Sequence, residues 1–494
     1  MFARTDSKRG DTEATQSLLG KEEHISVKRT FRHWLVGPIA FFYVSGYIMS
    51  FNVFAQFIFD KIKRTDYPNV TIQNDMTNCN VNKSSETYKV RKELEQKSAQ
   101  WQMYISLAGS IIAVFSNLVL GSYTDRFGRK FLFYIGTFGS LLRTCLVAAA
   151  MYWDLNRLFY IIPFTVEGFS GTQSTILQVT FIYVADLTKR GKQRSFGIVL
   201  MELSFGLAGA SSGFGSGYAI KWAGFFGASA IAAGFYLMSL LLVFILPETF
   251  VNKRTYTPKL QNLKDAIGFY SDQANSGKRW IYIVTLLIYT LCALSFIGSA
   301  AIEPLYQLST PFCWTPLKIG WFSALRIGCQ QVVGMLFVKP LQMRLSDKTI
   351  AVISAAFSAA TYTLEGVASN DVMLYLVTVV GTGGNLTIPM IRSIMSCLTP
   401  PDKQGAIFST MSAMNQICNV FSNVLTNTIY SATTSVFSGT VFIIFAGLQF
   451  VNVLLLLMLI YRTRTSDDNY SRMEDVPEIN VNKTDVDEDH QSIQ

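Results

Sequence analysis

Ionisable side chains inside long apolar runs are the residues of this chain with the clearest chemical potential. A charge in hydrocarbon is costly, so each one predicts a role in binding or in moving a solute. Arg392 follows a stretch rich in glycine and proline, from Gly381 to Pro389, where a broken helix would expose backbone groups to a cavity. A guanidinium there can hold a carboxylate through two parallel hydrogen bonds. We therefore predict that Arg392 and the nearby Asn385 bind an anionic substrate.

Glu167 is a second ionisable residue whose surroundings predict a function. It lies near the middle of its apolar run, after Pro163 and before Gly168 and Gly171, so its helix should also be broken. A glutamate removed from water can load and release a proton within the physiological pH range. The three histidines lie outside the apolar runs. If protons drive this protein, carboxylates such as Glu167 must carry them, and we also place Glu167 in the substrate site.

The remaining charges in the apolar runs have less informative surroundings. Together with Arg392 and Glu167, they are three arginines and four glutamates: Arg143, Arg326, Arg392, Glu167, Glu202, Glu303 and Glu365. Their charges nearly balance. For Arg143, Arg326 and Glu365 we therefore expect mutual pairing that holds helices together.

The composition is that of a protein with many membrane spans. Half of its 494 residues are hydrophobic and 15% are charged, whereas a soluble protein carries about 25% charged residues. The net charge of +9 arises from cations in loops beside apolar runs, which indicates attraction to anionic lipid rather than to nucleic acid. The polar segments hold no metal-spaced set of cysteines and histidines, no phosphate-binding loop and no nucleophile elbow. We therefore expect neither an enzyme nor a bound cofactor or metal.

The apolar runs divide the chain into two halves of six spans each. Residues 1–33 and 462–494 are polar tails, residues 34–246 and 280–461 hold the spans, and residues 247–279 form a polar, basic connector. A helix needs about 20 apolar residues to cross the hydrocarbon core. The cations gather on loops that would share one side of the membrane, so both tails and the connector are predicted to be cytoplasmic. The expected fold is an all-α membrane protein with twelve transmembrane helices.

Glycines recur at every fourth position in the fifth span, at Gly209, Gly213 and Gly217. This spacing lets another helix approach closely in lipid. We expect helix packing on this face rather than a ligand site.

A polar segment of ten residues, GSYTDRFGRK, separates the second and third spans. Its order of glycine, aspartate, glycine and cations resembles the loop between the second and third transmembrane helices of major facilitator superfamily transporters. That resemblance implies two six-helix halves related by a pseudo-twofold axis. We expect five of its residues to act in gating: Gly121, Asp125, Arg126, Gly128 and Arg129. Asp125 would pair with a cation or a helix end in only one state, so Asp125→Asn should impair turnover more than substrate affinity.

The long polar loop between the first two spans, residues 60–100, carries signs of exposure outside the cell. Asn69 and Asn82 each begin a glycosylation sequon. Cys79 lies in the same loop, and Cys313 lies in the loop after the seventh span, whereas the other five cysteines lie inside predicted spans. Since the exterior is oxidising, we predict a disulfide between Cys79 and Cys313 that joins the two halves.

Two further stretches resemble one family of transporters. Residues Pro389 to Ser409, PMIRSIMSCLTPPDKQGAIFS, and Tyr183 to Gly209, YVADLTKRGKQRSFGIVLMELSFGLAG, are similar to solute carrier family 46, the proton-coupled folate transporter family. The resemblance implies that Glu202 is the proton-coupling carboxylate and that Arg392 binds substrate and protons. The folate transporter itself uses a histidine in its seventh span, which this chain lacks. The family also includes members proposed to carry conjugated steroids, muropeptides and cyclic dinucleotides, so the resemblance implies these substrate classes beside folate.

The predicted function is secondary active transport, by proton-coupled symport of a small organic anion through alternating access. One alternative is an antiporter or exporter, although Gly213 is followed by Phe214 rather than by the proline typical of those proteins. The other is a receptor on the same fold that does not transport. We expect a monomer or a weak dimer in the lipid bilayer of the plasma membrane. A tyrosine pattern at Tyr470 to Met473 makes endosomal or lysosomal membranes a further location.

Overall fold

The computed structural model describes residues 31–68, 86–189, 191–249, 279–308, 311–312, 314, 316–399, 404–433 and 436–474. Within these ranges the regular structure is helical throughout, with no β-strand. The predicted all-α fold is therefore confirmed. The sequons at Asn69 and Asn82, the cysteines Cys79 and Cys313, and most of the two tails and the connector lie outside the described residues.

The described residues of the first half form a series of helices. In chain order they are η1 (Phe31–Leu35), α2 (Val36–Asp66), α3 (Glu86–Phe127), α4 (Arg129–Tyr152), η2 (Arg157–Tyr160), α5 (Ile161–Phe169), α6 (Thr172–Leu187) and α7 (Lys192–Ile245). Helix α3 starts well before the apolar part of the second span. Its first turns therefore project beyond the hydrocarbon core, as polar residues at a span end permit.

Glycines at positive φ divide two of these segments. Gly171, at φ 78°, separates α5 from α6, so the break predicted around Glu167 is confirmed. Gly224, at φ 67°, interrupts the 54 residues of α7. A straight helix of that length would measure about 81 Å, far more than the roughly 30 Å of a hydrocarbon core. The two parts of α7 therefore serve as the fifth and sixth spans.

The second half contains more interruptions than the first. Its elements are α9 (Arg279–Leu308), α10 (Pro316–Ile327), the π-helix η4 (Gly328–Val333), α11 (Gly334–Leu336), α12 (Val338–Arg344), α13 (Asp347–Gly366), α14 (Asp371–Gly381), η5 (Gly384–Leu386), α15 (Thr387–Leu398), α16 (Gln404–Thr433) and α17 (Thr440–Glu474). Helix α14 and the segment from Gly384 to Leu398 meet at a bend of 43°. This bend lies in the glycine-rich stretch where the sequence predicts a broken helix.

The helices account for the expected number of spans. Seven are long and apolar enough to cross a membrane, and the bent pair provides an eighth. Helix α7 supplies two spans, and α5 with α6, α13 and α16 supply three more. Counted in this way, the described residues contain twelve membrane-length segments, six from each half.

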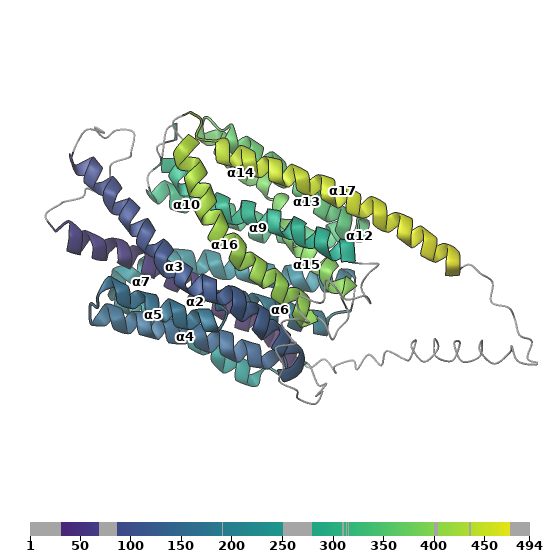
Figure 1. Ribbon diagram of the computed structural model, residues 1–494, viewed down its shortest axis with the longest axis horizontal. Coiled ribbons are helices and arrows are strands. Elements are labelled where there is room, and N and C mark those ends of the chain that lie inside the picture. Colours follow the sequence, from purple (N-terminus) through teal and green to yellow (C-terminus); the bar gives the residue numbers. More distant parts are fainter. Residues whose placement is uncertain are drawn as a thin grey trace, which may run out of the picture.

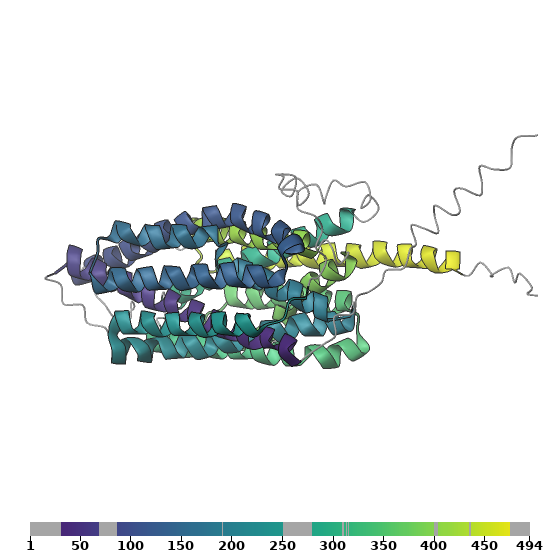
Figure 2. The same cartoon turned by 90° about the horizontal axis from the view of Figure 1, so that it is seen from below.

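The two halves pack side by side along the long axis of the molecule. In Figure 1 the first half, purple to blue, lies below the second half, green to yellow, and α16 runs between α3 and α9. Figure 2 shows the helices running in one common direction, with α17 extending past the others. A single core cluster contains buried side chains from both halves, among them Ile39, Phe181, Ile391 and Phe408. The halves therefore share one interior.

The polar segment between α3 and α4 is mostly helical, which corrects the expected loop. Helix α3 continues through Phe127, and a single residue, Gly128 at φ 96°, separates it from α4. Glycine adopts this backbone conformation without strain. The side chains of residues 121–126 are not described. The gating roles expected for Gly121, Asp125, Arg126, Gly128 and Arg129 stay predictions. We call the end of the bundle that holds Gly128 the hinge end.

Acidic side chains hold the start of α4 at the hinge end. Glu248 accepts hydrogen bonds from the backbone N–H groups of Arg129 at 2.8 Å and Lys130 at 3.0 Å. These first N–H groups of a helix have no acceptor within it, and the helix dipole favours an anion beside them. The Arg129 side chain is fully buried, and its Nε lies 2.9 Å from Oδ2 of Asp186, at the end of α6. The hinge is thus tied to two other elements of its own half.

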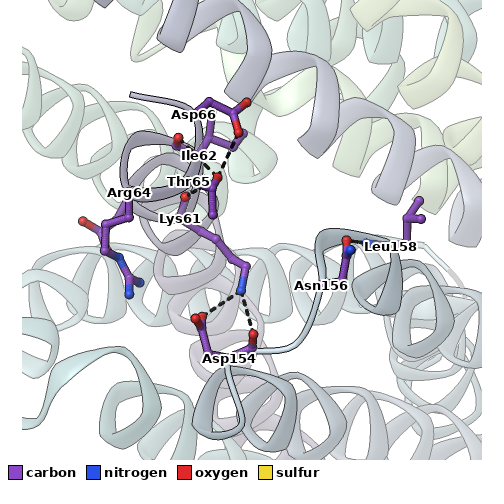
Figure 3. Close-up of polar contacts among 9 residues, drawn as sticks. Lys61, Ile62, Arg64, Thr65, Asp66, Asp154, Asn156 and Leu158 are labelled. Carbon is purple, nitrogen blue, oxygen red and sulfur yellow. Dashed lines mark hydrogen bonds and ion pairs between the residues drawn. The ribbon is translucent and has the colours of Figure 1, made fainter. Parts of the chain in front are cut away.

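The opposite end of the first half, which we call the loop end, has its own polar contacts. Lys61 near the end of α2 donates to the carboxylate of Asp154 at 2.7 Å and to its backbone carbonyl at 3.1 Å (Figure 3). Asp154 lies in the turn after α4 at φ 48°. Two residues on, Asn156 accepts the backbone N–H of Leu158 and begins η2. These contacts fix the turn from α4 to α5 against α2.

The glycine stripe of the fifth span lies in open space. A Cβ added at Gly209, Gly213 or Gly217 would meet no atom within 4 Å. The close helix packing predicted for this face is therefore absent from the described part of the chain, and that prediction was wrong.

Candidate functional site

An ion pair between the two halves marks the candidate substrate site. Arg392 of α15 and Glu202 of α7 are joined through Nη1 and Oε1. Both side chains are largely buried, at 12% and 15% exposure. A buried charge is costly unless it is paired, so each of these residues requires the other in this state. The contact therefore couples the charge of one half to that of the other.

Aromatic rings surround the guanidinium of Arg392. Its Cζ lies 4.5 Å from the ring centre of Phe181 on α6 and 5.6 Å from that of Tyr289 on α9. Its Nη2 also donates to the hydroxyl of Tyr289 at 3.3 Å. Phe181 stacks on Phe408 of α16, with ring centres 6.2 Å apart. The cation thus lies between the π faces of these rings, which attract it. The same rings provide apolar surface against which the apolar part of a ligand can pack.

A small pocket adjoins this cation, and an unsatisfied amide lies on its wall. The pocket is lined by residues of α6, α9, α15 and α16, including Gln178, Met411 and Asn415. Gln178 is 1% exposed, and neither its Nε2 nor its Oε1 has a hydrogen-bond partner among the described residues. Buried amides are normally satisfied. Gln178 is therefore suited to bind a polar group of a ligand.

The break between α14 and α15 positions Arg392. At Gly384 the backbone approaches α13 so closely that Ser358 donates to its carbonyl at 2.7 Å. A Cβ at Gly383 would lie 2.9 Å from the ring of Phe357. Only glycine permits this approach. Asn385, which the sequence places in the substrate site, lies in η5 and is not among the residues that line the pocket of Arg392.

Glu167 belongs to a different network, inside the first half. Its Oε2 lies 3.0 Å from Nε of Arg143 on α4, and both side chains are about 95% buried. Ser140 donates to its other oxygen at 2.8 Å, and Arg143 donates to Ser50 at 2.8 Å. The structure thus pairs Glu167 with Arg143 and separates it from the pocket of Arg392. Its predicted roles in substrate binding and proton coupling stay predictions.

Polar contacts also join the halves at the hinge end. Arg194, in the first turn of α7, donates to the backbone carbonyl of Ser396 at 2.9 Å. The hydroxyls of Ser195 and Ser393 lie 2.6 Å apart, and Ser195 also donates to Asp347 at the start of α13. These contacts close the hinge end between α7, α13 and α15.

Reasoning from the sequence identified the two charges of the site but missed several of their neighbours. Tyr289, Phe181 and Gln178 were not singled out, because an aromatic or amide residue in an apolar run carries no distinct signal. Arg194 and Glu248 carry no distinct signal either, because both stand in polar sequence beside apolar runs. Their importance depends on contacts between helices that are distant in sequence.

Comparison with known proteins agrees with this architecture. The sequence profile of the Major Facilitator Superfamily matches residues 39–302 and 285–484. The chain is 26% identical to the lysosomal proton-coupled steroid conjugate and bile acid symporter SLC46A3 of Gallus gallus, over 88% of this chain and 95% of that protein. It is 27% identical to the proton-coupled folate transporter of Rattus norvegicus, over 74% of this chain and 80% of the other.

Solved structures show the same fold at low sequence identity. The human organic anion transporter MFSD10 (TETRAN) superposes with a TM-score of 0.62, at 14% identity, covering 86% of this chain and 99% of that one. The proton:xylose symporter XylE superposes with a TM-score of 0.61, at 11% identity, covering 86% and 95%. The protein is thus a multi-pass membrane protein and a transporter rather than an enzyme. It belongs to the major facilitator superfamily, and it is similar to curated transporters of solute carrier family 46.

Proposed function

We propose that this secondary transporter carries an amphipathic organic anion together with protons, by symport through alternating access. The observation that carries the proposal is the ion pair of Arg392 and Glu202, which lies between the two halves and beside a pocket. An anion that reaches Arg392 competes with Glu202 for the guanidinium. Substrate binding and the charge of Glu202 are therefore thermodynamically linked.

Protonation of Glu202 resolves this competition. With the carboxylate neutral, Arg392 loses its partner and is left as a buried cation, which a substrate anion then compensates. With Glu202 ionised, the internal pair re-forms and the substrate is released. Each anion thus enters with a proton, and the loaded site carries no added net charge. This account gives Glu202 the role of proton carrier and Arg392 that of substrate ligand.

The residues around Arg392 favour a substrate with a broad apolar body and an anionic group. Phe181, Phe408, Tyr289 and Met411 offer apolar and aromatic contact, while Gln178 offers an unsatisfied amide. A conjugated steroid or a bile acid has this shape, and the Gallus gallus relative is named for both. We therefore rank these above folate, muropeptides and cyclic dinucleotides. Because the Gallus gallus relative is named as lysosomal, we propose the lysosomal membrane as a location beside the plasma membrane.

Uptake into proteoliposomes tests the proposal directly. Purified protein is reconstituted, and entry of a labelled steroid sulfate, a bile acid and folate is measured with and without an inward proton gradient. The expected result is gradient-dependent uptake of the first two that ends when a protonophore is added. Flux driven only by an opposing substrate gradient would instead indicate an exchanger. Binding without flux under every gradient would indicate a receptor.

A further inference from the structure

A second charged cluster lies in the second half, away from the site of Arg392. Arg326 of α10 contacts Glu365 of α13 through two hydrogen bonds, from Nη1 at 2.8 Å and from Nη2 at 3.1 Å. The same Nη1 lies 2.5 Å from Oε1 of Glu303 on α9. Glu303 is fourteen residues beyond Tyr289 on the same helix, a distance of about 21 Å along the axis. The cluster is therefore a separate site.

The formal charges of this cluster do not balance. One guanidinium stands against two carboxylates, and the exposed fractions of the side chains are 0% for Glu365, 11% for Arg326 and 12% for Glu303. A buried carboxylate that lacks its own counter-ion binds a proton in preference to remaining charged. Glu365 holds both branches of the guanidinium, whereas Glu303 contacts only one nitrogen. The proton therefore belongs on Glu303.

Among the residues that the structure describes, no other charged group faces the cluster to offset this excess. From α13, Tyr362 faces Arg326. On α9, Tyr306 donates to the backbone carbonyl of Glu365 at 3.0 Å, and Tyr430 of α16 lies near Tyr306. Helix α17 packs on the same helices and offers the amides Gln449 and Asn452, which face Cys292. The recorded titratable neighbours are thus tyrosines and a cysteine, which are neutral at physiological pH.

Gln307 is placed so that its amide could bind either protonation form of Glu303. It is fully buried, one turn after Glu303, and its Nε2 donates to Oε1 of Glu303 at 3.0 Å. Its own Oε1 has no hydrogen-bond partner among the described residues. A rotation of the amide by 180° would present this oxygen to a protonated Glu303 and accept its O–H. One side chain can therefore serve both forms of the carboxyl group.

The position of Glu303 on α9 links this chemistry to movement. The next residue is Pro304, inside the helix. Proline has no N–H to donate to the carbonyl four residues earlier, so the helix can bend there. While Glu303 is ionised, its contact with Arg326 holds this part of α9 against α10. Protonation removes that attraction at the point where the helix is weakest.

We propose that Glu303, Arg326 and Glu365 form a second proton-binding site, in which Glu303 takes up one proton from water. Protonation thereby releases the C-terminal part of α9, around Pro304, from α10. The proton comes from a hydronium ion, whose O–H bond breaks as the carboxyl O–H bond of Glu303 forms, and a water molecule is left. The site is independent of the proposed role of Glu202, and proton binding here is measurable without any transported substrate.

Proton counting on the purified full-length protein in detergent tests this site. Between about pH 5 and pH 8, back-titration should show that wild type takes up one proton more than Glu303→Gln. Glu365→Gln should show the same deficit, because Glu303 then has Arg326 to itself. The control is Asp60→Asn, which removes an exposed carboxylate paired with Arg64 within α2 and should leave the proton count unchanged.

A label on α9 tests the coupled movement. Leu305 is 44% exposed, so a fluorophore on Leu305→Cys, in a background with the exposed Cys145 changed to serine, reports on this end of the helix. Its emission should change with pH, and the change should disappear when Glu303→Gln is added. Equal proton counts in wild type and both glutamine variants would overturn the proposal. A pH response that vanishes when choline replaces Na⁺ would overturn it in favour of a sodium site.

Discussion

At the scale of single residues, the chemistry of this protein depends on how each buried charge is compensated. Arg143 and Glu167 balance within the first half, Arg392 and Glu202 balance between the halves, and the cluster around Arg326 does not balance. The sequence predicts that these residues are buried and important, because each stands inside an apolar run. It also predicts their mutual pairing, but not which partner each one has, since partners lie on helices far apart in the chain.

Substitutions of Arg392 should distinguish the contribution of its positive charge from that of its paired nitrogen contacts. Arg392→Lys keeps the cation but loses the second nitrogen that reaches Tyr289, so proton-driven uptake should fall about tenfold, equivalent to about 1.4 kcal/mol. Arg392→Gln leaves Glu202 as an unpaired buried carboxylate and should abolish uptake and lower the melting temperature. The double variant Arg392→Gln with Glu202→Gln should regain stability without regaining uptake. Full uptake by Arg392→Lys would show that the paired contacts of the guanidinium are not needed for transport.

At the scale of elements, interrupted helices place the functional side chains. The breaks at Gly171 and Gly383 could be predicted because glycine and proline lie close together around them. The shortness of the break at Gly128 could not, since polar residues before it are compatible with either a loop or an exposed helix end. Its geometry depends on Glu248, more than a hundred residues away in the chain.

Gly128→Ala should destabilise the hinge end. The added Cβ would lie 2.5 Å from Oε2 of Glu248, and the backbone at φ 96° disfavours any side chain. Strain of this kind costs about 1–3 kcal/mol, so thermal unfolding should shift down by several degrees. Gly213→Ala, in open helical surroundings, is the matched control and should change little. An equal shift in both variants would contradict the role of Glu248.

The contact between Lys61 and Asp154 should make loop-end stability depend on pH. The hydrogen bond from Lys61 lowers the pKa of Asp154 below its ordinary value of 3.8. A carboxyl group whose pKa is lower in the folded state stabilises that state at pH values above its ordinary pKa. This stabilisation is lost as the pH falls through the pKa of the folded state. Asp154→Asn should therefore lower the melting temperature by about 2 °C at neutral pH.

The difference between Asp154→Asn and wild type should shrink as the pH falls below about 4. Asp154 is 65% exposed while Lys61 is 6% exposed, so most of the effect should come from the buried lysine that loses its partner. Replacing Lys61 by methionine in the same background should recover part of the loss. A pH-independent difference would show that the turn geometry, not the charge, holds this end together.

At the scale of the whole molecule, the recorded polar contacts between the halves at the hinge end close that end of the bundle. Arg194, Ser195, Ser393 and Ser396 must separate if the hinge end is to open during alternating access. The sequence predicts the two halves and their span number from hydrophobicity. It does not predict which end is closed, because that is a property of one conformational state.

A cross-link at the hinge end should arrest transport without preventing binding. The hydroxyls of Ser195 and Ser393 lie 2.6 Å apart, which brings their Cβ atoms near the separation of a disulfide. Oxidised Ser195→Cys with Ser393→Cys should therefore lose uptake and regain it on reduction. Substrate-induced thermal stabilisation should persist in the oxidised form. Unchanged uptake after complete oxidation would show that these positions need not separate.

The pairing of Arg392 with Glu202 also has a consequence for biosynthesis. The two residues are 190 positions apart, so the first half must enter the membrane before the arginine has been synthesised. Arg143 and Glu167 both belong to the first half and can pair as soon as it is inserted. Glu202 remains a buried carboxyl group without its partner until α15, which carries Arg392, is inserted. A nascent or truncated first half therefore carries an unpaired carboxyl group inside a membrane span, which cellular quality control can recognise.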